Sequence, residues 1–394
     1  MKKLFSIFLL VIVLGITYYY INNNEKAEEK NSTDQVEEKL IANQEIKKSI
    51  FKKYYKEAQK IVTKMTIEEK IGQLFLVRYD STEVEEYNKY NPGGYILFAK
   101  DFENHTKDTI KEQLKSNQNI SKYPLIFGVD EEGGFVTRVS RFKNFRAERF
   151  KAPKDYYNEG GYELLEKVEN EKANLLKEIG INLNLAPVAD VSTNENDFIY
   201  NRTFGEDATK TAEYIKEMVK YANNNSLSAC LKHFPGYGNN SDTHTGSAVD
   251  NRPYQNFVEN DYLPFKAGIE ENVPCILVSH NIITEMDADR PASLSTKVIA
   301  ELREKLDYSG IIITDDLAMD AVKNYVDNNE AATLAINAGN DMIITSDFIP
   351  MYNELLSSYN SNIISEETIN KAVLRIISWK FNNNLFLEEG EQDD

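Results

Sequence analysis

Cysteine and histidine are scarce in this sequence of 394 residues, which has two cysteines and four histidines. Cys230 and Cys275 both lie in apolar runs, so we expect two buried thiols. A disulfide framework of more than one bridge is impossible with two cysteines. No group of cysteines and histidines has the spacing of a zinc site. These absences exclude the small domains that depend on several disulfides or on a Cys/His zinc cluster.

Positive charge is also in deficit, because 45 lysines and arginines face 63 aspartates and glutamates, for a formal net charge of −18. An acidic chain of this kind is not expected to bind nucleic acid. It would also repel strongly anionic polymers, although a local basic pocket could still bind one carboxylate. The hydrophobic content of 41% and the charged content of 27% predict that most of the chain is globular.

A long apolar run lies near the start of the sequence. Lys2 and Lys3 precede apolar residues that continue to about residue 21. A positive start followed by an apolar stretch is typical of a targeting segment, and this stretch is long enough to span a bilayer. No cysteine follows it for lipid attachment, and no clear Ala-x-Ala cleavage site is present. These features favour an uncleaved signal anchor, with a cleaved signal peptide as the alternative.

Both alternatives place the body of the chain outside the cell, either on the extracellular face of the membrane or secreted. Membrane contact would then occur through the N-terminal segment alone. The polar residues that follow the apolar run are typical of a tether. We therefore divide the chain into a signal peptide or anchor (1–21), a polar tether (22–44), a single folded domain (45–386) and an acidic tail (387–394).

Eight short apolar runs recur along the folded domain, separated by stretches with helical spacing. They lie at 74–77, 95–98, 125–129, 183–188, 229–231, 275–278, 311–313 and 342–344. Continuous apolar runs are typical of parallel strands that are buried on both faces. Eight strand–helix units predict an α/β fold, a (β/α)8 barrel of the TIM type, and a doubly wound open sheet is the alternative. A helix over about 366–382 should close the barrel.

Polar and charged residues follow six of these runs. They are Arg78 and Asp80; Asp130, Glu131 and Glu132; Asp190; Lys232 and His233; Ser279 and His280; and Thr314, Asp315 and Asp316. The carboxyl ends of barrel strands open on one face, where barrel enzymes have their active sites. We therefore expect these side chains to converge on one site.

Asp315 and Asp316 are the candidates for a nucleophile or a base. We expect Asp316 to cap a helix that begins at residue 317, which leaves Asp315 to point into the barrel. Neighbouring cations such as Lys232 would keep it ionised there. A carboxylate nucleophile with a separate proton donor is what retaining glycoside hydrolysis requires.

A glycine-rich loop after the fifth run contains Asp242 and His244. A carboxylate two residues from a histidine can hold one ring nitrogen and raise the basicity of the ring. The other nitrogen is then free to transfer a proton. Two of the four histidines of the chain lie in this stretch, 230–244. An isolated Asp-x-His is also compatible with an ordinary solvated loop. The pair alone therefore does not decide between a proton-transfer site and such a loop.

Several stretches together resemble glycoside hydrolase family 3, in its β-N-acetylglucosaminidase branch. The similarity extends from about residue 65 to residue 342, over nearly the whole predicted barrel. The Lys-His-Phe-Pro-Gly segment at 232–236 is the most specific match. The other matching segments are 128–138, 184–190, 201–205, 242–244 and 313–319.

The resemblance implies a retaining, exo-acting hydrolase that removes terminal β-N-acetylglucosamine, with peptidoglycan fragments as substrates outside the cell. Asp315 would be the nucleophile, and His244, oriented by Asp242, would be the acid/base. No metal or organic cofactor is implied. The resemblance assigns sugar binding to Asp130, Arg138, Arg202, Lys232 and His233.

The sequence departs from the family pattern at two positions. Tyr237 stands where the family usually has a histidine, and Phe135 stands where an arginine is common. The loop to His244 is also about one residue shorter than usual. Three alternatives remain open: a β-glycosidase of another sugar such as a glucosidase or xylosidase, a glycoside phosphorylase, and, outside enzymes, a surface-tethered glycan-binding protein.

Overall fold

The computed structural model describes residues 48–238, 248–326 and 330–386. The chain divides into two units, Met1–Lys52 and Lys53–Asp394, and the fold described here is that of the second. The predicted targeting segment, the tether, Asp242, His244 and the acidic tail lie outside the described residues. Within the described ranges, no helix is both long and apolar enough to cross a membrane.

The core of the second unit is a closed barrel of parallel strands. Their order around the barrel is β1, β2, β3, β4, β5, β7, β9 and β10, and β10 pairs back with β1. The strands are β1 (Phe75–Arg78), β2 (Gly94–Leu97), β3 (Ile126–Val129), β4 (Leu183–Asn184), β5 (Ser228–Phe234), β7 (Cys275–Val278), β9 (Ile311–Asp316) and β10 (Met342–Thr345). Each overlaps one of the eight apolar runs, so the predicted (β/α)8 barrel is confirmed and the open sheet is wrong. The short strands β6 (Val249–Asp250) and β8 (Ile282–Ile283) form a separate sheet.

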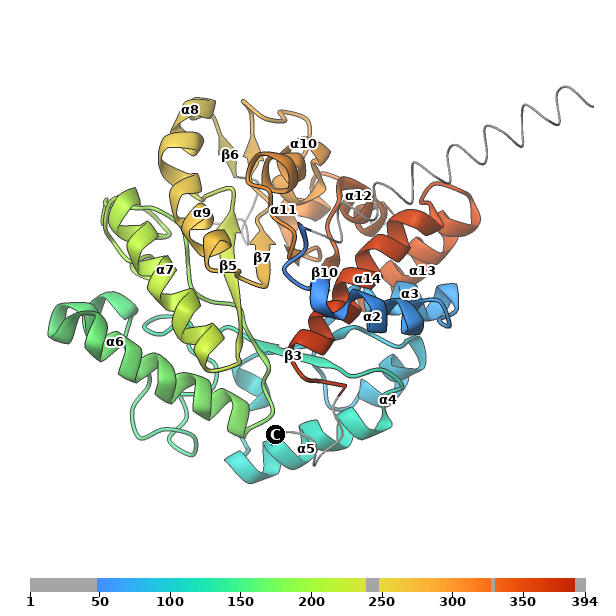
Figure 1. Cartoon of the computed structure of the whole chain (residues 1–394), viewed down its shortest axis with the longest axis horizontal. Coiled ribbons are helices and arrows are strands. Elements are labelled where there is room, and N and C mark those ends of the chain that lie inside the picture. Colours follow the sequence, from blue (N-terminus) through green and yellow to red (C-terminus); the bar gives the residue numbers. More distant parts are fainter. Residues whose placement is uncertain (1–47, 239–247, 327–329, 387–394) are drawn as a thin grey trace, which may run out of the picture. The chain divides into compact units, whose positions relative to one another are not determined.

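Helices surround the strands on the outside (Figure 1). The longest, α6 (Pro153–Glu178), is kinked where Gly160 and Gly161 leave the helical conformation. The last, α14 (Glu366–Asn382), has the bounds that the sequence predicts. The other helices are α2 (Tyr55–Val62), α3 (Ile67–Gln73), α4 (Val84–Tyr87), α5 (Lys107–Ile120), α7 (Ala208–Asn224), α8 (Tyr254–Asn256), α9 (Tyr262–Glu270), α10 (Thr296–Ala300), α11 (Asp320–Lys323), α12 (Ala331–Ala338) and α13 (Phe348–Asn360).

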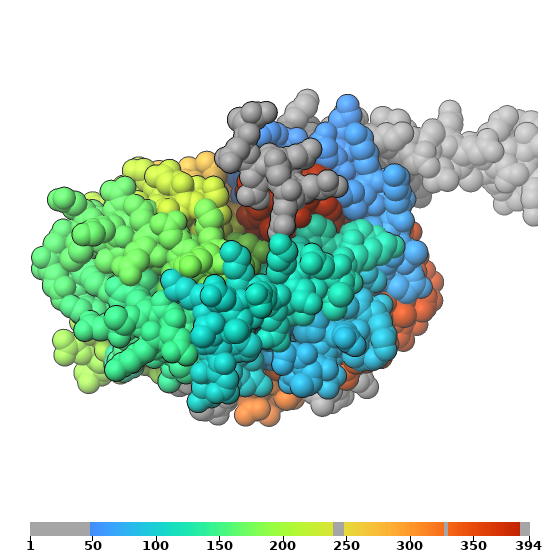
Figure 2. All heavy atoms as spheres, turned by 90° about the horizontal axis from the view of Figure 1, so that it is seen from below, coloured from blue at the N-terminus to red at the C-terminus, as the bar shows by residue number. Residues whose placement is uncertain are grey.

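Successive strand–helix units are neighbours in space. In Figure 2 the colours pass in order from blue through teal to green across the face turned to the viewer. The loops that follow β3 and β4 are neighbours, because Arg202 in the second contacts Glu132 in the first over 2.8 Å.

The barrel interior is apolar, and both cysteines lie in it. Cys230 on β5 is paired in register with Cys275 on β7, and both are buried free thiols, as predicted. Burial raises the pKa of the Cys275 thiol. All seven residues of β5 are buried, including the polar residues at its end. The barrel therefore buries Lys232 and His233 at the end of β5.

Helix α14 closes the amino end of the barrel. Its Trp379 ring nitrogen donates to Oγ of Ser228, the first residue of β5, over 3.0 Å. Its Lys380 ammonium donates to the side-chain oxygen of Gln73, just before β1, over 2.6 Å. Lys380 is fully buried, and burial lowers its pKa to about 7. The carboxyl ends of the strands therefore face away from this helix, toward the candidate site.

Candidate active site

The carboxyl ends of the barrel strands surround a pocket of about 270 Å³. Its lining residues come from the ends of seven strands and from the loops that follow them. They are Ile96, Phe98, Asp130, Glu132, Val136, Arg138, Leu185, Arg202, Lys232, His233, Leu277, Asp315, Asp316, Met319 and Ile344. All six described residues of the predicted site therefore meet in one place. Asp242 and His244, the other two, lie outside the described residues.

Not every residue that follows a strand reaches this pocket. Arg78 pairs with Asp101 over 2.7 Å instead of lining the pocket. His280 is also absent from the lining, because its ring bonds Oγ of Ser293 at 2.7 Å and the backbone oxygen of Asp316 at 3.0 Å. The expectation that all these side chains converge is therefore wrong for the seven that do not line the pocket: Arg78, Asp80, Glu131, Asp190, Ser279, His280 and Thr314. Arg78 and His280 bond other parts of the fold instead.

Lys232 lies at the centre of the pocket floor. Its ammonium is 2.7 Å from Oδ1 of Asp130 and 2.6 Å from Oε1 of Glu132, and its side chain is only 3% exposed. Burial alone would lower the pKa of Lys232, but Asp130 and Glu132 outweigh burial and hold it above the ordinary value. The ammonium is therefore a fixed cationic donor with two anionic partners.

Glu132 connects two of the cations, a role that the sequence did not reveal. Nε and Nη2 of Arg202 contact its carboxylate at 3.1 and 2.8 Å, and Lys232 approaches the same group. Burial opposes ionisation of Glu132, but Arg202 and Lys232 outweigh it and hold the pKa of the carboxyl far below its usual range. The sequence shows only that Glu132 follows β3. Its partners, Arg202 and Lys232, lie 70 and 100 residues farther along the chain, so no local pattern reveals the contact.

His233 is fixed by contacts at both ring nitrogens. Nδ1 lies 2.7 Å from Oδ2 of Asp190, and Nε2 lies 3.2 Å from Nη2 of Arg202. Because Asp190 accepts from Nδ1, the network assigns the lone pair to Nε2, which accepts from Arg202. The other oxygen of Asp190 accepts from the backbone nitrogen of Tyr237 over 2.7 Å. One buried carboxylate thus orients the histidine and the loop after β5.

A second buried carboxylate fixes the loop after β3. Glu131 accepts from the backbone nitrogens of Arg138 and Val139, each at 2.7 Å, and from Ser140 at 3.2 Å. This places the Arg138 guanidinium 5.2 Å from the Phe98 ring and 3.4 Å from Asp130. Between these anchors the chain makes a tight turn whose Phe135 side chain is 73% exposed.

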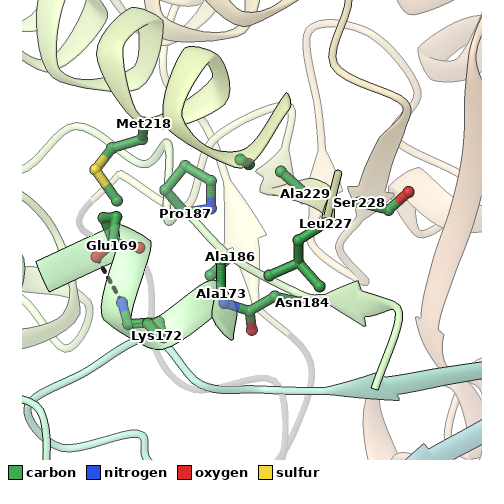
Figure 3. Close-up of a pocket in the computed structure, with 11 residues that line it drawn as sticks. Glu169, Lys172, Ala173, Asn184, Ala186, Pro187, Met218, Leu227, Ser228 and Ala229 are labelled. Atoms are coloured by element: carbon green, nitrogen blue, oxygen red, sulfur yellow. Dashed lines mark hydrogen bonds and ion pairs between the residues drawn. The ribbon is translucent and has the colours of Figure 1, made fainter. Parts of the chain in front are cut away.

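An ion pair supports this loop from behind. Lys172 on α6 contacts Glu169 over 2.6 Å, as Figure 3 shows, and also donates to the backbone oxygen of Glu132 over 3.4 Å. The ion pair borders a second cavity of only about 20 Å³ between α6, α7 and the strands. A space of that size holds about one water molecule, so it is not a substrate site.

Asp315 is the last residue but one of β9 and lines the pocket, but the local structure around it differs from the prediction. Helix α11 begins at Asp320 instead of residue 317, so Asp316 is not its N-cap. The Asp316 carboxylate accepts from the backbone nitrogen of Ala318 over 2.9 Å and from Oγ of Ser346 over 2.6 Å. An aspartate that bonds the chain two residues on favours a turn over a helix start.

After segment 239–247, the partly exposed guanidinium of Arg252 holds two buried carboxylates. Arg252 contacts Asp261 over 3.0 Å and Asp250 over 2.8 Å. Burial raises the pKa of Asp261 to about 7, even though Arg252 opposes the shift. Gly238 has a φ of 55°, and a Cβ there would lie 2.4 Å from the Arg252 guanidinium carbon. Only glycine therefore fits where the chain passes Arg252.

Lys232, Arg202 and His233 of the pocket are paired before any ligand arrives. Within residues 48–238, 248–326 and 330–386, no group of three acidic, histidine or cysteine side chains is arranged to hold a metal ion. Two of the carboxylates that line the pocket, Asp130 and Glu132, face lysine and arginine side chains instead. Such fixed donors and acceptors are suited to hydroxyl groups.

Residues 66–379 match the family described as the glycosyl hydrolase family 3 N terminal domain. The chain belongs to glycosyl hydrolase family 3. This confirms the resemblance seen in the sequence motifs, and the protein is a glycosidase that acts on O-glycosyl bonds. The family 3 domain covers the whole barrel, from the N-cap of α3 to Trp379 within α14.

The family 3 domain resembles curated beta-hexosaminidases. A beta-hexosaminidase of Nitrosomonas eutropha is 29% identical over 286 residues, which is 70% of this chain and 80% of the relative. A beta-hexosaminidase of Tolumonas auensis is 30% identical over 279 residues, which is 67% of this chain and 78% of the relative.

A solved structure gives the same result for the fold. A glycoside hydrolase family 3 beta-N-acetylglucosaminidase from Paenibacillus superposes with a TM-score of 0.77 at 25% identity. The match covers 84% of this chain but 65% of the Paenibacillus chain, which is just under two thirds of its length.

Proposed function

We propose that this family 3 glycosidase is a retaining, exo-acting β-N-acetylglucosaminidase that works through a covalent glycosyl-aspartate. The names of its relatives support this specificity, since they are beta-hexosaminidases or a beta-N-acetylglucosaminidase. The observation that carries the proposal is the single pocket that Asp315 shares with the predicted sugar-binding residues. Its volume of about 270 Å³ is at the small end for a ligand site, which suits one terminal sugar.

In the first step, the Asp315 carboxylate attacks the anomeric carbon, and the bond to the leaving oxygen breaks. His244, oriented by Asp242, gives that oxygen a proton. In the second step, His244 takes a proton from water, the water oxygen attacks the anomeric carbon, and Asp315 is released. The two inversions at the carbon retain its configuration. The roles of His244 and Asp242 rest on the sequence motif.

The remaining pocket residues hold the sugar. Lys232, Arg138 and Arg202 supply charge-assisted donors to hydroxyl oxygens, and Asp130 supplies an acceptor. The His233 ring lines the same wall and contacts Nη2 of Arg202, which it helps to position. Because ion pairs fix these side chains beforehand, little reorganisation is needed when the transition state forms.

Peptidoglycan fragments outside the cell are the proposed substrates. The support is the N-terminal sequence, in which two lysines precede a long apolar run and a polar tether. A protein anchored in this way would have the barrel outside the cell, with access to cell-wall glycans. Exposure of the full-length protein to protease on intact cells tests this location, and resistance there would contradict it.

The test of the activity is a panel of aryl glycosides that share one leaving group. The N-acetylglucosaminide should turn over far faster than the glucoside or the xyloside, with retained configuration in the first product. Preference for another sugar would make the protein a different β-glycosidase. A sugar 1-phosphate formed in the presence of phosphate would identify a phosphorylase. Binding without turnover of any member would identify a glycan-binding protein.

A further inference from the structure

The chain that follows β3 is strongly basic in an otherwise acidic protein. Residues 138–154 contain seven lysines and arginines and one acidic residue, Glu148, a net charge of +6 in a chain of net charge −18. The basic residues are Arg138, Arg141, Lys143, Arg146, Arg149, Lys151 and Lys154. Such a local reversal of charge marks a surface at which an anion would be attracted.

Four of these cations already have partners within the fold. Arg138 faces Asp130 at 3.4 Å, Arg146 faces Glu171 at 2.8 Å, Lys151 faces Glu159 at 2.6 Å, and Lys154 donates to the Tyr200 hydroxyl over 2.6 Å. The other three, Arg141, Lys143 and Arg149, are exposed and have no carboxylate partner in the part of the chain that the structure describes. Their charge is therefore available to a ligand.

These three cations lie on a fixed loop that begins in the pocket wall. Arg138 lines the pocket, and Glu131 binds three consecutive backbone nitrogens from residue 138 onward. Arg141 follows three residues after Arg138, so their Cα atoms lie at most about 11 Å apart. Farther along, the backbone nitrogen of Phe150, the neighbour of Arg149, donates to Oγ of Ser140, the neighbour of Arg141, over 3.1 Å. The loop therefore returns on itself and brings Arg149 close to Arg141, and it starts at Arg138 in the pocket wall.

We propose that Arg141, Lys143 and Arg149 form an anion-binding surface for a carboxylate on the leaving-group side of the substrate. This inference rests on the proposed function, because it concerns the part of the glycan beyond the terminal sugar. Terminal N-acetylglucosamine carries no charge, and the pocket has room for about one sugar. A carboxylate that contacts the surface therefore belongs to the next sugar or to a peptide attached to it.

The surface would counteract the effect of the net negative charge of the protein on an acidic substrate. A chain of net charge −18 repels an acidic glycan, and this repulsion lowers the rate at which the glycan reaches the pocket. Three exposed cations on the loop that leaves the pocket wall would offset the repulsion where the glycan enters. Because these side chains are exposed, their effect is modest at each position and is screened by salt.

The test compares two triple variants with equal loss of charge. R141Q/K143Q/R149Q removes the surface, and K56Q/K60Q/K64Q is the control. The control lysines are exposed on and beside α2, which packs against α14 at the amino end of the barrel. The two substrates are chitobiose, which is neutral, and N-acetylglucosamine linked to N-acetylmuramic acid, which carries a carboxylate.

At low salt, R141Q/K143Q/R149Q should raise KM for the acidic disaccharide by about tenfold and leave kcat unchanged. Chitobiose should be unaffected, high salt should remove the difference, and the control should match wild type. Equal changes for both substrates, or no change, would overturn the proposal. If the wild-type protein cleaves neither disaccharide, the proposed function itself fails.

An anionic membrane is the competing partner for these cations. Sedimentation with vesicles of phosphatidylcholine, with and without phosphatidylglycerol, distinguishes it. If R141Q/K143Q/R149Q loses vesicle binding while KM for the acidic disaccharide stays at the wild-type value, the surface binds lipid and the proposal is wrong. Unchanged vesicle binding together with the raised KM supports the carboxylate.

Discussion

Lys232 and Glu132 form a buried ion pair at the floor of the pocket, with 2.6 Å between Nζ and Oε1 and side chains that are 3% and 4% exposed. Glu132 also binds Arg202, so one carboxylate positions two of the cations assigned to the sugar. Removing one partner of a buried pair leaves an uncompensated charge and typically costs about 3 kcal/mol or more. The pocket is therefore sensitive to single substitutions at this pair.

Glu132→Gln should lower both stability and activity. The neutral amide leaves Lys232 and Arg202 without their shared anion, so we expect about 3 kcal/mol less stability and at least a tenfold lower kcat/KM. The matched control is Asp341→Asn, which disturbs a carboxylate held by Arg303 and Arg375 at the amino end. It should lose stability but retain kcat/KM below its melting temperature. Equal activity losses in the two variants would mean that Glu132 has only a structural role.

Lys232→Met should weaken binding of the terminal sugar while it preserves the packing of the aliphatic stem. The change removes a charge-assisted donor, so kcat/KM for an aryl N-acetylglucosaminide should fall by about a hundredfold or more. Steady-state kinetics below the melting temperature measure this. Unchanged kinetics with a lowered melting temperature would contradict the assignment of Lys232 to the sugar.

His244→Ala should lower the rate by different factors for substrates with different leaving groups. An alkoxide needs a proton to depart, whereas a nitrophenolate leaves without help, so chitobiose cleavage should fall far more than release of nitrophenol. Pre-steady-state kinetics should then show a burst, followed by slow turnover as the glycosyl-enzyme accumulates. Equal losses for both leaving groups would show that His244 is not the acid/base.

Lys380 should make the stability of the barrel depend on pH. Its folded pKa of about 7 lies below the ordinary value for lysine, so between pH 7 and about 10 the unfolded chain binds a proton that the folded chain does not. The contribution of Lys380 to the free energy of unfolding therefore rises with pH over that window and is lowest below pH 7.

Lys380→Met should remove this dependence. At pH 7 the variant should be more stable by on the order of 3 kcal/mol, and the difference should shrink as the pH approaches 10. Lys70→Met is the control, because Lys70 pairs with the half-exposed Glu366 and should change stability by less than about 1 kcal/mol. Denaturant unfolding across this pH range measures both. If the stability difference between Lys380→Met and wild type grew with pH, the predicted direction of the pH dependence would be wrong.

The strands could be predicted because each is a continuous apolar run, which is the local signature of a strand buried on both faces. The residues at the strand ends then followed from barrel geometry, and Asp130, Lys232 and Asp315 do meet. The role of Glu132 could not be predicted, because it depends on partners from β5 and from the loop after β4. Burial of Lys380 likewise depends on how α14 packs, and no local pattern shows it.

The start of α11 shows another feature that could not be predicted from the sequence. The pattern after β9 has the aspartate and the apolar spacing of a capped helix, and the prediction placed the cap at Asp316. In the structure, Oγ of Ser346, just after β10, donates a hydrogen bond to Oδ2 of Asp316, and the helix begins only at Asp320. A residue distant in sequence thus decided a local structure.

The most direct test of the account is to identify the residue that becomes glycosylated. A 5-fluoro N-acetylglucosaminyl fluoride should react with the protein, slow the second step and leave the sugar attached to one peptide. Mass spectrometry of the digested protein should find the label on Asp315, and Asp315→Asn should remain folded, unlabelled and inactive. A label on Asp316, or full activity in Asp315→Asn, would contradict the assignment of the nucleophile.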